Sequence, residues 1–109
     1  MNVTVIGTGY VGLVTGACFS EFGVQVVCAD RIEEKVAALS RCEMPIYEPG
    51  LEDVVRRNIK AGRLAFTTDT AEAIRSALVV FIAVGTPAGK DGSTDLSHVE
   101  GVAREIGRN

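Results

Sequence analysis

Short apolar runs alternate along the chain with longer stretches in which apolar residues recur at helical spacing. The runs at 2–6, 24–29 and 78–84 are rich in valine and isoleucine and predict strands, and residues 64–68 predict a weaker, partly polar one. The run at 78–84 contains no polar residue, which is typical of a strand covered on both faces of a parallel sheet.

The stretches between these runs predict helices, and Leu51 and Val55 begin one apolar helical face. The predicted helices are residues 11–22, 31–41, 51–62, 70–77 and 96–108. Asp69 or Thr70 is a candidate cap for the fourth helix. Residues 44–50 hold two prolines and a glycine and are predicted to be a loop. This alternation indicates the α/β class, with helices on both faces of a mostly parallel sheet.

The composition is that of a folded domain, with 47% hydrophobic and 23% charged residues. No apolar run approaches the roughly 20 residues that a membrane span needs. The net charge of -3, with scattered basic residues, argues against a nucleic-acid partner. Cys18, Cys28 and Cys42 form no metal-binding or disulfide pattern, so we expect small buried residues in a reducing compartment. We therefore expect a cytoplasmic, soluble protein with no membrane partner and no metal.

The motif at residues 7–12 is Gly-x-Gly-x-x-Gly, placed between a predicted strand and a predicted helix. Gly7 permits a tight turn, Gly9 leaves room for a pyrophosphate, and Gly12 lets the helix approach the strand. The backbone amides of Tyr10 and Val11 are then free to bind phosphate at the positive end of the helix dipole. The alternative interpretation of these glycines is a tight strand-to-helix connection that binds no ligand.

Asp30 ends the second predicted strand 18 residues after Gly12, about the spacing at which an acid accepts hydrogen bonds from the adenosine ribose hydroxyls. Its charge favours NAD, because a carboxylate repels the 2'-phosphate of NADP. Arg31 leaves room for use of both cofactors, and a helix N-cap is the alternative role for Asp30. Together with the glycines, this acid predicts an NAD-binding Rossmann-type doubly wound sheet.

Three further residues are candidates for contact with the cofactor. Lys35 lies one turn into the second predicted helix and reaches the adenosine pocket in this interpretation, although a solvated lysine is the alternative. Gly85 and Thr86 follow the strand at 78–84, at the carboxyl edge where open α/β sheets bind ligands. An ordinary strand-to-loop transition explains these two residues equally well. We assign no role to His98.

Four motifs in order resemble the UDP-glucose/GDP-mannose dehydrogenase family over the whole chain. They are the glycine turn at 6–13, Tyr-Glu-Pro-Gly-Leu at 47–51, Gly-Arg-Leu at 62–64 with Thr-Thr-Asp at 67–69, and Val-Gly-Thr-Pro at 84–87. The resemblance implies oxidation of a sugar-nucleotide primary alcohol to a carboxylate with two NAD in succession. The wording at 47–51 is nearer to the branch that converts UDP-glucose to UDP-glucuronate.

Carried over by position, the family's cofactor contacts fall on the glycine turn with the Tyr10 and Val11 amides, and on Asp30, Lys35 and Thr86. The family's catalytic cysteine, with its lysine, asparagine and aspartate partners, lies beyond residue 109. The resemblance therefore implies no catalytic residue in this chain, and it implies a homo-oligomeric parent enzyme.

A complete doubly wound sheet has about six strands, and this chain predicts four. We therefore expect residues 1–109 to be a partial NAD-binding Rossmann domain, truncated before its last strands, with the central and C-terminal substrate domains absent. Two alternatives remain for the function. One is the NAD-binding domain of another two-domain dehydrogenase, of the GDP-mannose or hydroxyacyl type, and the other is a non-enzymatic NAD-sensing module.

Overall fold

Strands and helices alternate in the computed structural model, which describes residues 2–45, 47–83, 103–104 and 106–107. The strands are β1 (Asn2–Ile6), β2 (Gln25–Ala29), β3 (Leu64–Thr67) and β4 (Val79–Ile82). The helices are α1 (Tyr10–Glu21), α2 (Glu33–Ser40), α3 (Leu51–Lys60) and α4 (Thr70–Arg75). The order confirms the prediction, with ends displaced by a residue or two. Of the predicted helix at 96–108, only 103–104 and 106–107 lie within the described residues, and these are helical.

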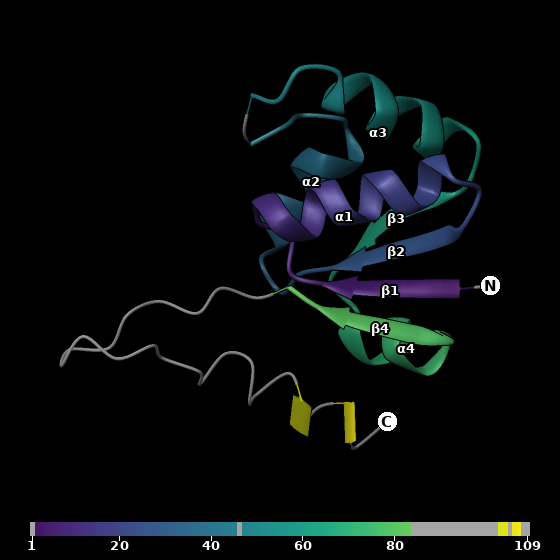
Figure 1. Ribbon diagram of the computed structural model, residues 1–109. Helices are drawn as coiled ribbons and strands as arrows, with labels where there is room; N and C mark the ends of the chain where they lie inside the picture. The colour runs from purple at the N-terminus through teal and green to yellow at the C-terminus, as the bar shows by residue number, and fades with distance from the viewer. Residues whose placement is uncertain (1, 46, 84–102, 105, 108–109) are drawn as a thin grey trace, which may run out of the picture.

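The four strands form one parallel sheet in the order β3-β2-β1-β4 (Figure 1). The register aligns the ends of the two central strands, because Ile6 pairs with Ala29. Ile6 also pairs with Ile82 of β4 on its other side. The chain therefore leaves β1 and β2 side by side at the same edge of the sheet.

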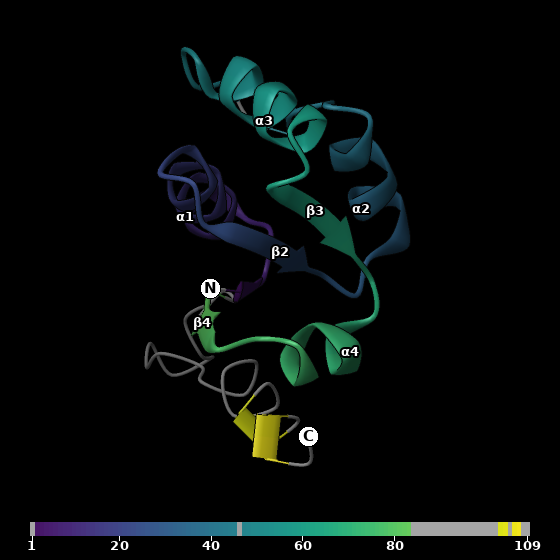
Figure 2. The ribbon, with the colours of Figure 1, turned by 90° about the vertical axis from the view of Figure 1, so that its right-hand side faces the viewer.

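Helices cover both faces of this sheet, as the predicted class requires. Figure 2 shows α1 and α3 on one side and α4 on the other, and α2 packs against β3. The main core lies under α1 and α3, and its buried residues are Val3, Val5, Leu13, Ala17, Val26, Cys28, Leu39, Leu51, Val55 and Leu64. This core fixes α1 over the ends of β1 and β2.

Two glycines let α1 sit directly on the sheet. A Cβ at Gly12 would overlap the carbonyl oxygen of Gly7, so no side chain fits there. A Cβ at Gly16, one turn later, would lie 2.5 Å from Sγ of Cys28 on β2. The predicted role of Gly12 in close packing is therefore confirmed.

A polar cluster around the buried Asn58 ties the other end of α1 to α3. Asn58 is fully buried, and its Nδ2 donates to Oε2 of Glu21 and to the carbonyl of Val54, each at 2.8 Å. Its Oδ1 accepts from Nε of Arg63 at 2.9 Å, and Nη2 of Arg57 donates to the other oxygen of Glu21 at 2.8 Å. Every polar atom of the Asn58 side chain thus has a partner.

Two predictions about burial are wrong. β4 was expected to be covered on both faces, yet Phe81 and Ile82 are each 39% exposed. The reason is position, since β4 borders only β1 within the described part of the chain and the ring of Phe19, 5.1 Å away, is a partial cover for Phe81. Cys18 is exposed, because it lies on α1 away from the sheet, while Cys28 and Cys42 are buried as expected.

Within the described residues, every helix is too short or too polar to cross a membrane.

Candidate functional site

The turn between β1 and α1 leaves a helix end open. Gly7 has a φ of 103°, which favours glycine, and its amide donates to the carbonyl of Ala29 at 2.8 Å, which joins the turn to β2. Gly9 is the N-cap of α1 and supplies no side-chain cap. Among the described residues, nothing lies within 4 Å of a Cβ built at Gly9. Within the described part of the chain, no atom therefore crowds Gly9 at the start of α1, as a phosphate-binding turn requires.

Asp30 follows β2 and directs its carboxylate at this turn. Its Oδ2 accepts from the backbone amide of Thr8 at 3.1 Å and from the Thr8 hydroxyl at 2.7 Å. Its Oδ1 accepts from the amide of Ile32 at 3.0 Å. The N-cap of α2 is Ile32, without a side-chain cap, so Asp30 closes a turn before the helix and is not its N-cap. The acid and the glycine turn are thus brought together.

The surroundings of Asp30 keep it ionised. Burial raises the pKa of its carboxyl, but hydrogen bonds from the Thr8 hydroxyl and from the amides of Ile32 and Thr8 outweigh this, and the pKa is lowered. The nearby charge of Lys35 acts in the same direction, with Nζ 3.7 Å from Oδ2. Lys35 is therefore an ion-pair partner of Asp30 rather than a solvated lysine.

Tyr10 and Val11 form the first turn of α1, with side chains 53% and 65% exposed. The Tyr10 hydroxyl donates to Oε2 of Glu48 at 3.2 Å. The negative charge of Glu48 and this hydrogen bond raise the pKa of Tyr10. The loop that bears Glu48 is thereby joined to the start of α1.

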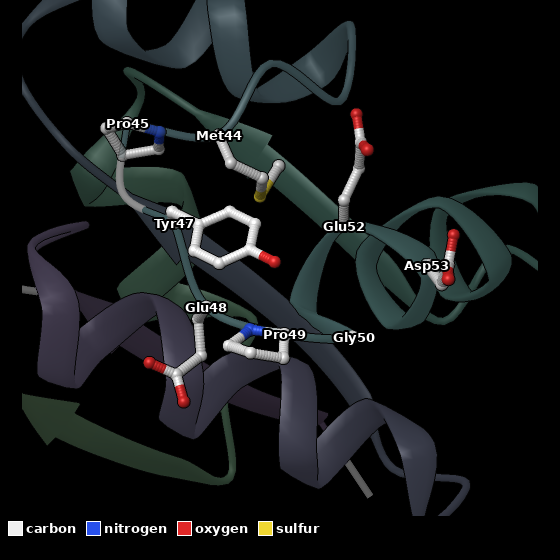
Figure 3. A pocket seen from close by; sticks show the side chains of 8 residues that line it. All are labelled: Met44, Pro45, Tyr47, Glu48, Pro49, Gly50, Glu52 and Asp53. Atoms are coloured by element: carbon white, nitrogen blue, oxygen red, sulfur yellow. The ribbon is translucent and has the colours of Figure 1, made fainter.

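Figure 3 shows this loop from close by, with Glu48 pointing toward α1. The loop and the start of α3 enclose a pocket of about 400 Å³, lined by Met44, Pro45, Tyr47, Glu48, Pro49, Gly50, Glu52 and Asp53. Gly50 has a φ of 82° as the N-cap of α3, and Leu51 is buried. The motif at 47–51 thus combines a turn, a core anchor and the contact to Tyr10.

Sequence reasoning missed Thr8 and Glu48. Thr8 occupies a variable position of the glycine motif, and only its hydroxyl signals a partner for a nearby acid. Glu48 is far from Tyr10 in sequence, and no spacing rule joins them. Gly85 and Thr86 lie outside the described residues, so their roles stay predictions.

Residues 1–109 match the NAD binding domain of the UDP-glucose/GDP-mannose dehydrogenase family. The chain belongs to this family. A UDP-glucose 6-dehydrogenase of Pseudomonas aeruginosa is 61% identical over 98% of the chain and 24% of that relative. A GDP-mannose 6-dehydrogenase of Pseudomonas syringae is 43% identical, also over 98% of the chain and 24% of its own length. The chain thus spans about a quarter of the length of these relatives.

Two solved structures of the family share this fold. The chain superposes on a UDP-glucose dehydrogenase of the archaeon Pyrobaculum islandicum with a TM-score of 0.94 and 43% identity, over 98% of the chain and 25% of that structure. A ternary complex of GDP-mannose dehydrogenase from Pseudomonas aeruginosa gives a TM-score of 0.94 and 41% identity. This match covers 98% of the chain and 24% of that structure. The parallel sheet with helices on both faces is therefore the NAD-binding Rossmann-type fold of the family, and NAD is its cofactor.

Proposed function

We propose that this chain supplies the NAD-binding part of a dehydrogenase that oxidises UDP-glucose to UDP-glucuronate. Two observations favour UDP-glucose over GDP-mannose. The UDP-glucose 6-dehydrogenase named above is 61% identical, against 43% for the GDP-mannose 6-dehydrogenase. The residues Tyr-Glu-Pro-Gly-Leu at 47–51 also resemble the UDP-glucose branch of the family more than its other branches.

The cofactor site in this proposal is the edge where β1 and β2 end. The pyrophosphate lies over Gly9 against the amides of Tyr10 and Val11, with Gly7 and Gly12 shaping the turn. The observation that carries the proposal is the space beside Gly9, which the described residues leave free at the uncapped start of α1.

The adenosine ribose in this proposal binds at Asp30. The carboxylate faces the glycine turn, and Lys35 beside it offsets part of its charge. Gly85 and Thr86 complete the site as predictions from the sequence.

The chain's own residues bind and orient the cofactor rather than carry out the reaction. When bound, NAD supplies the acceptor for the hydride that leaves the sugar alcohol. Asp30, ionised and fixed, holds one end of the cofactor, and the amides at the start of α1 hold its middle. The catalytic cysteine belongs, by resemblance to the family, to a region beyond residue 109. A cytoplasmic location, consistent with three unpaired thiols, and a homo-oligomeric state stay predictions.

Calorimetric titration of NAD and NADP into the chain tests the cofactor site. We expect NAD to bind and NADP to bind more weakly, because Asp30 repels a 2'-phosphate. A chain that circular dichroism shows to be folded, yet that takes up no NAD, would refute the proposed site. Equal affinity for the two cofactors would refute the role of Asp30.

Turnover tests the rest of the proposal. The chain alone is expected to form no NADH from UDP-glucose, and measurable NADH would show that the catalytic residues are wrongly placed. A protein that joins this chain to a substrate domain is expected to use UDP-glucose in preference to GDP-mannose. The opposite preference would move the chain to the GDP-mannose branch.

A further inference from the structure

We propose that Thr8 is a positioning residue for the cofactor, because its hydroxyl and amide fix the Asp30 carboxylate in the orientation that selects NAD over NADP. The inference rests on the proposed function, since it takes the adenosine ribose to bind at Asp30. It adds a residue that acts through Asp30 and decides between the two cofactors.

The geometry restrains the carboxylate from two sides. Thr8 is fully buried, and both of its donors reach the same oxygen, Oδ2, at 2.7 Å from the hydroxyl and 3.1 Å from the amide. The amide of Ile32 holds the other oxygen at 3.0 Å. Rotation of the carboxylate about its Cβ–Cγ bond breaks at least one of these bonds. Thr8 therefore sets the plane in which Asp30 presents its oxygens.

A count of acceptor positions shows which oxygen remains for a ligand. A carboxylate accepts about four hydrogen bonds, about two on each oxygen. The two donors of Thr8 fill Oδ2, whereas Ile32 leaves one position on Oδ1. Lys35 lies 3.7 Å from Oδ2, which is an ion-pair contact and longer than a hydrogen bond. A ribose hydroxyl is therefore expected to donate to Oδ1 of Asp30.

The same restraint excludes NADP. A fixed carboxylate cannot turn away from a 2'-phosphate, so the like-charge repulsion is felt in full. Once the Thr8 hydroxyl is removed, only the amides of Thr8 and Ile32 restrain the carboxylate, which can then turn more readily toward Lys35 and reduce that repulsion. Loss of the hydroxyl is therefore expected to weaken the binding of NAD and to reduce the discrimination against NADP.

The chain offers a matched control for the substitution Thr8→Val. Thr4 lies on β1, is 2% exposed, and its hydroxyl donates to the carbonyl of Ala73 at 2.7 Å. Thr4→Val thus removes a buried hydroxyl bond of the same length that does not involve Asp30. Thr8→Ser keeps the hydroxyl and serves as the conservative variant.

Calorimetry with NAD and NADP, on folded samples of the wild-type chain and these three variants, measures the selectivity. We expect Thr8→Val to lower the preference for NAD about tenfold, which corresponds to about 1.4 kcal/mol. Thr8→Ser and Thr4→Val are expected to keep the wild-type preference. An unchanged preference in Thr8→Val overturns the inference. Thr8→Ala replaces the valine variant if that variant does not fold.

A second measurement separates this inference from the proposed function. Nuclear magnetic resonance follows the Asp30 carboxyl through an acid titration without any cofactor. We expect its pKa to rise in Thr8→Val and to stay unchanged in Thr4→Val. If the wild-type chain binds no NAD, the proposed function fails. If the Asp30 titration is the same in Thr8→Val and wild type, Thr8 does not hold Asp30 and the inference fails, whichever cofactor binds.

Discussion

The substitution Gly9→Ser is expected to move stability and cofactor affinity in opposite directions. Gly9 is the N-cap of α1, with φ -70° and ψ -169°, a conformation open to any residue. Serine is a favoured N-cap, and its hydroxyl accepts from the second or third amide of the helix, here Val11 or Gly12. No atom of the described residues lies within 4 Å of the new Cβ. The fold therefore has no reason to resist this change.

The expected effect of Gly9→Ser on stability is much smaller than its expected effect on the affinity for NAD. Serine in place of glycine at an N-cap is worth only a few tenths of a kcal/mol, so the free energy of unfolding should stay the same or rise slightly. For NAD, the serine fills the space proposed for the pyrophosphate and occupies an amide proposed to bind it. Hydrogen bonds to a charged group are worth about 1.5–3 kcal/mol each. Losing two of them corresponds to a loss of affinity of about a hundredfold or more.

Urea unfolding and calorimetric titration of NAD, made on the same samples, check both expectations. Gly107→Ser is the matched control, because a Cβ at Gly107 also meets no described residue within 4 Å and Gly107 lies outside the turn. This control should bind NAD as the wild-type chain does. If Gly9→Ser binds NAD within about twofold of wild type, the pyrophosphate does not lie over Gly9 and the proposed site is wrong.

Three further substitutions, one of them with a control, test the fold at the two ends of α1. Gly12→Ala should cost several kcal/mol or prevent folding, since its Cβ overlaps the carbonyl of the turn; a cooperative transition near the wild-type midpoint would contradict this. Asp30 has a lowered pKa, so its stabilising effect is complete above about pH 4 and is lost as the pH falls through its folded value. The difference in stability between wild type and Asp30→Asn should therefore shrink in acid, and a constant difference would be inconsistent with an ionised Asp30. Asn58→Ala should cost about 2 kcal/mol in urea unfolding because Arg63 loses a buried partner, whereas exposed Glu52→Ala should cost under about 1 kcal/mol.

Local patterns predicted the order of the elements well. The cap of α4 at Asp69 is one example, since its side chain accepts from the amide of Glu72 at 3.1 Å, as a spacing rule within one helix turn expects. The approach of Asp30 to the glycine turn was also predictable, because parallel strands end at the same edge of a sheet. These features depend on residues that are near in sequence or joined by one strand register.

Contacts between side chains of different elements were not predictable in the same way. The bonds from Thr8 to Asp30 and from Tyr10 to Glu48 depend on where two chain segments cross, which periodicity does not encode. The exposure of β4 was misjudged for a related reason. An apolar composition shows that a strand can be buried, whereas its actual burial depends on which strands and helices lie beside it.

The close seating of α1 at Gly12 and Gly16 separates two parts of the proposed cofactor site, the backbone of the glycine turn and the side chains beside it. A Cβ at Gly12 would overlap the carbonyl oxygen of Gly7, and a Cβ at Gly16 would crowd Sγ of Cys28, so no side chain fits at either point. Apart from Thr8, which is bonded to Asp30, the side chains beside the turn are therefore expected to be replaceable without moving the first amides of α1. A redesign of this domain for a different dinucleotide should keep both glycines and change only the side chains beside the turn.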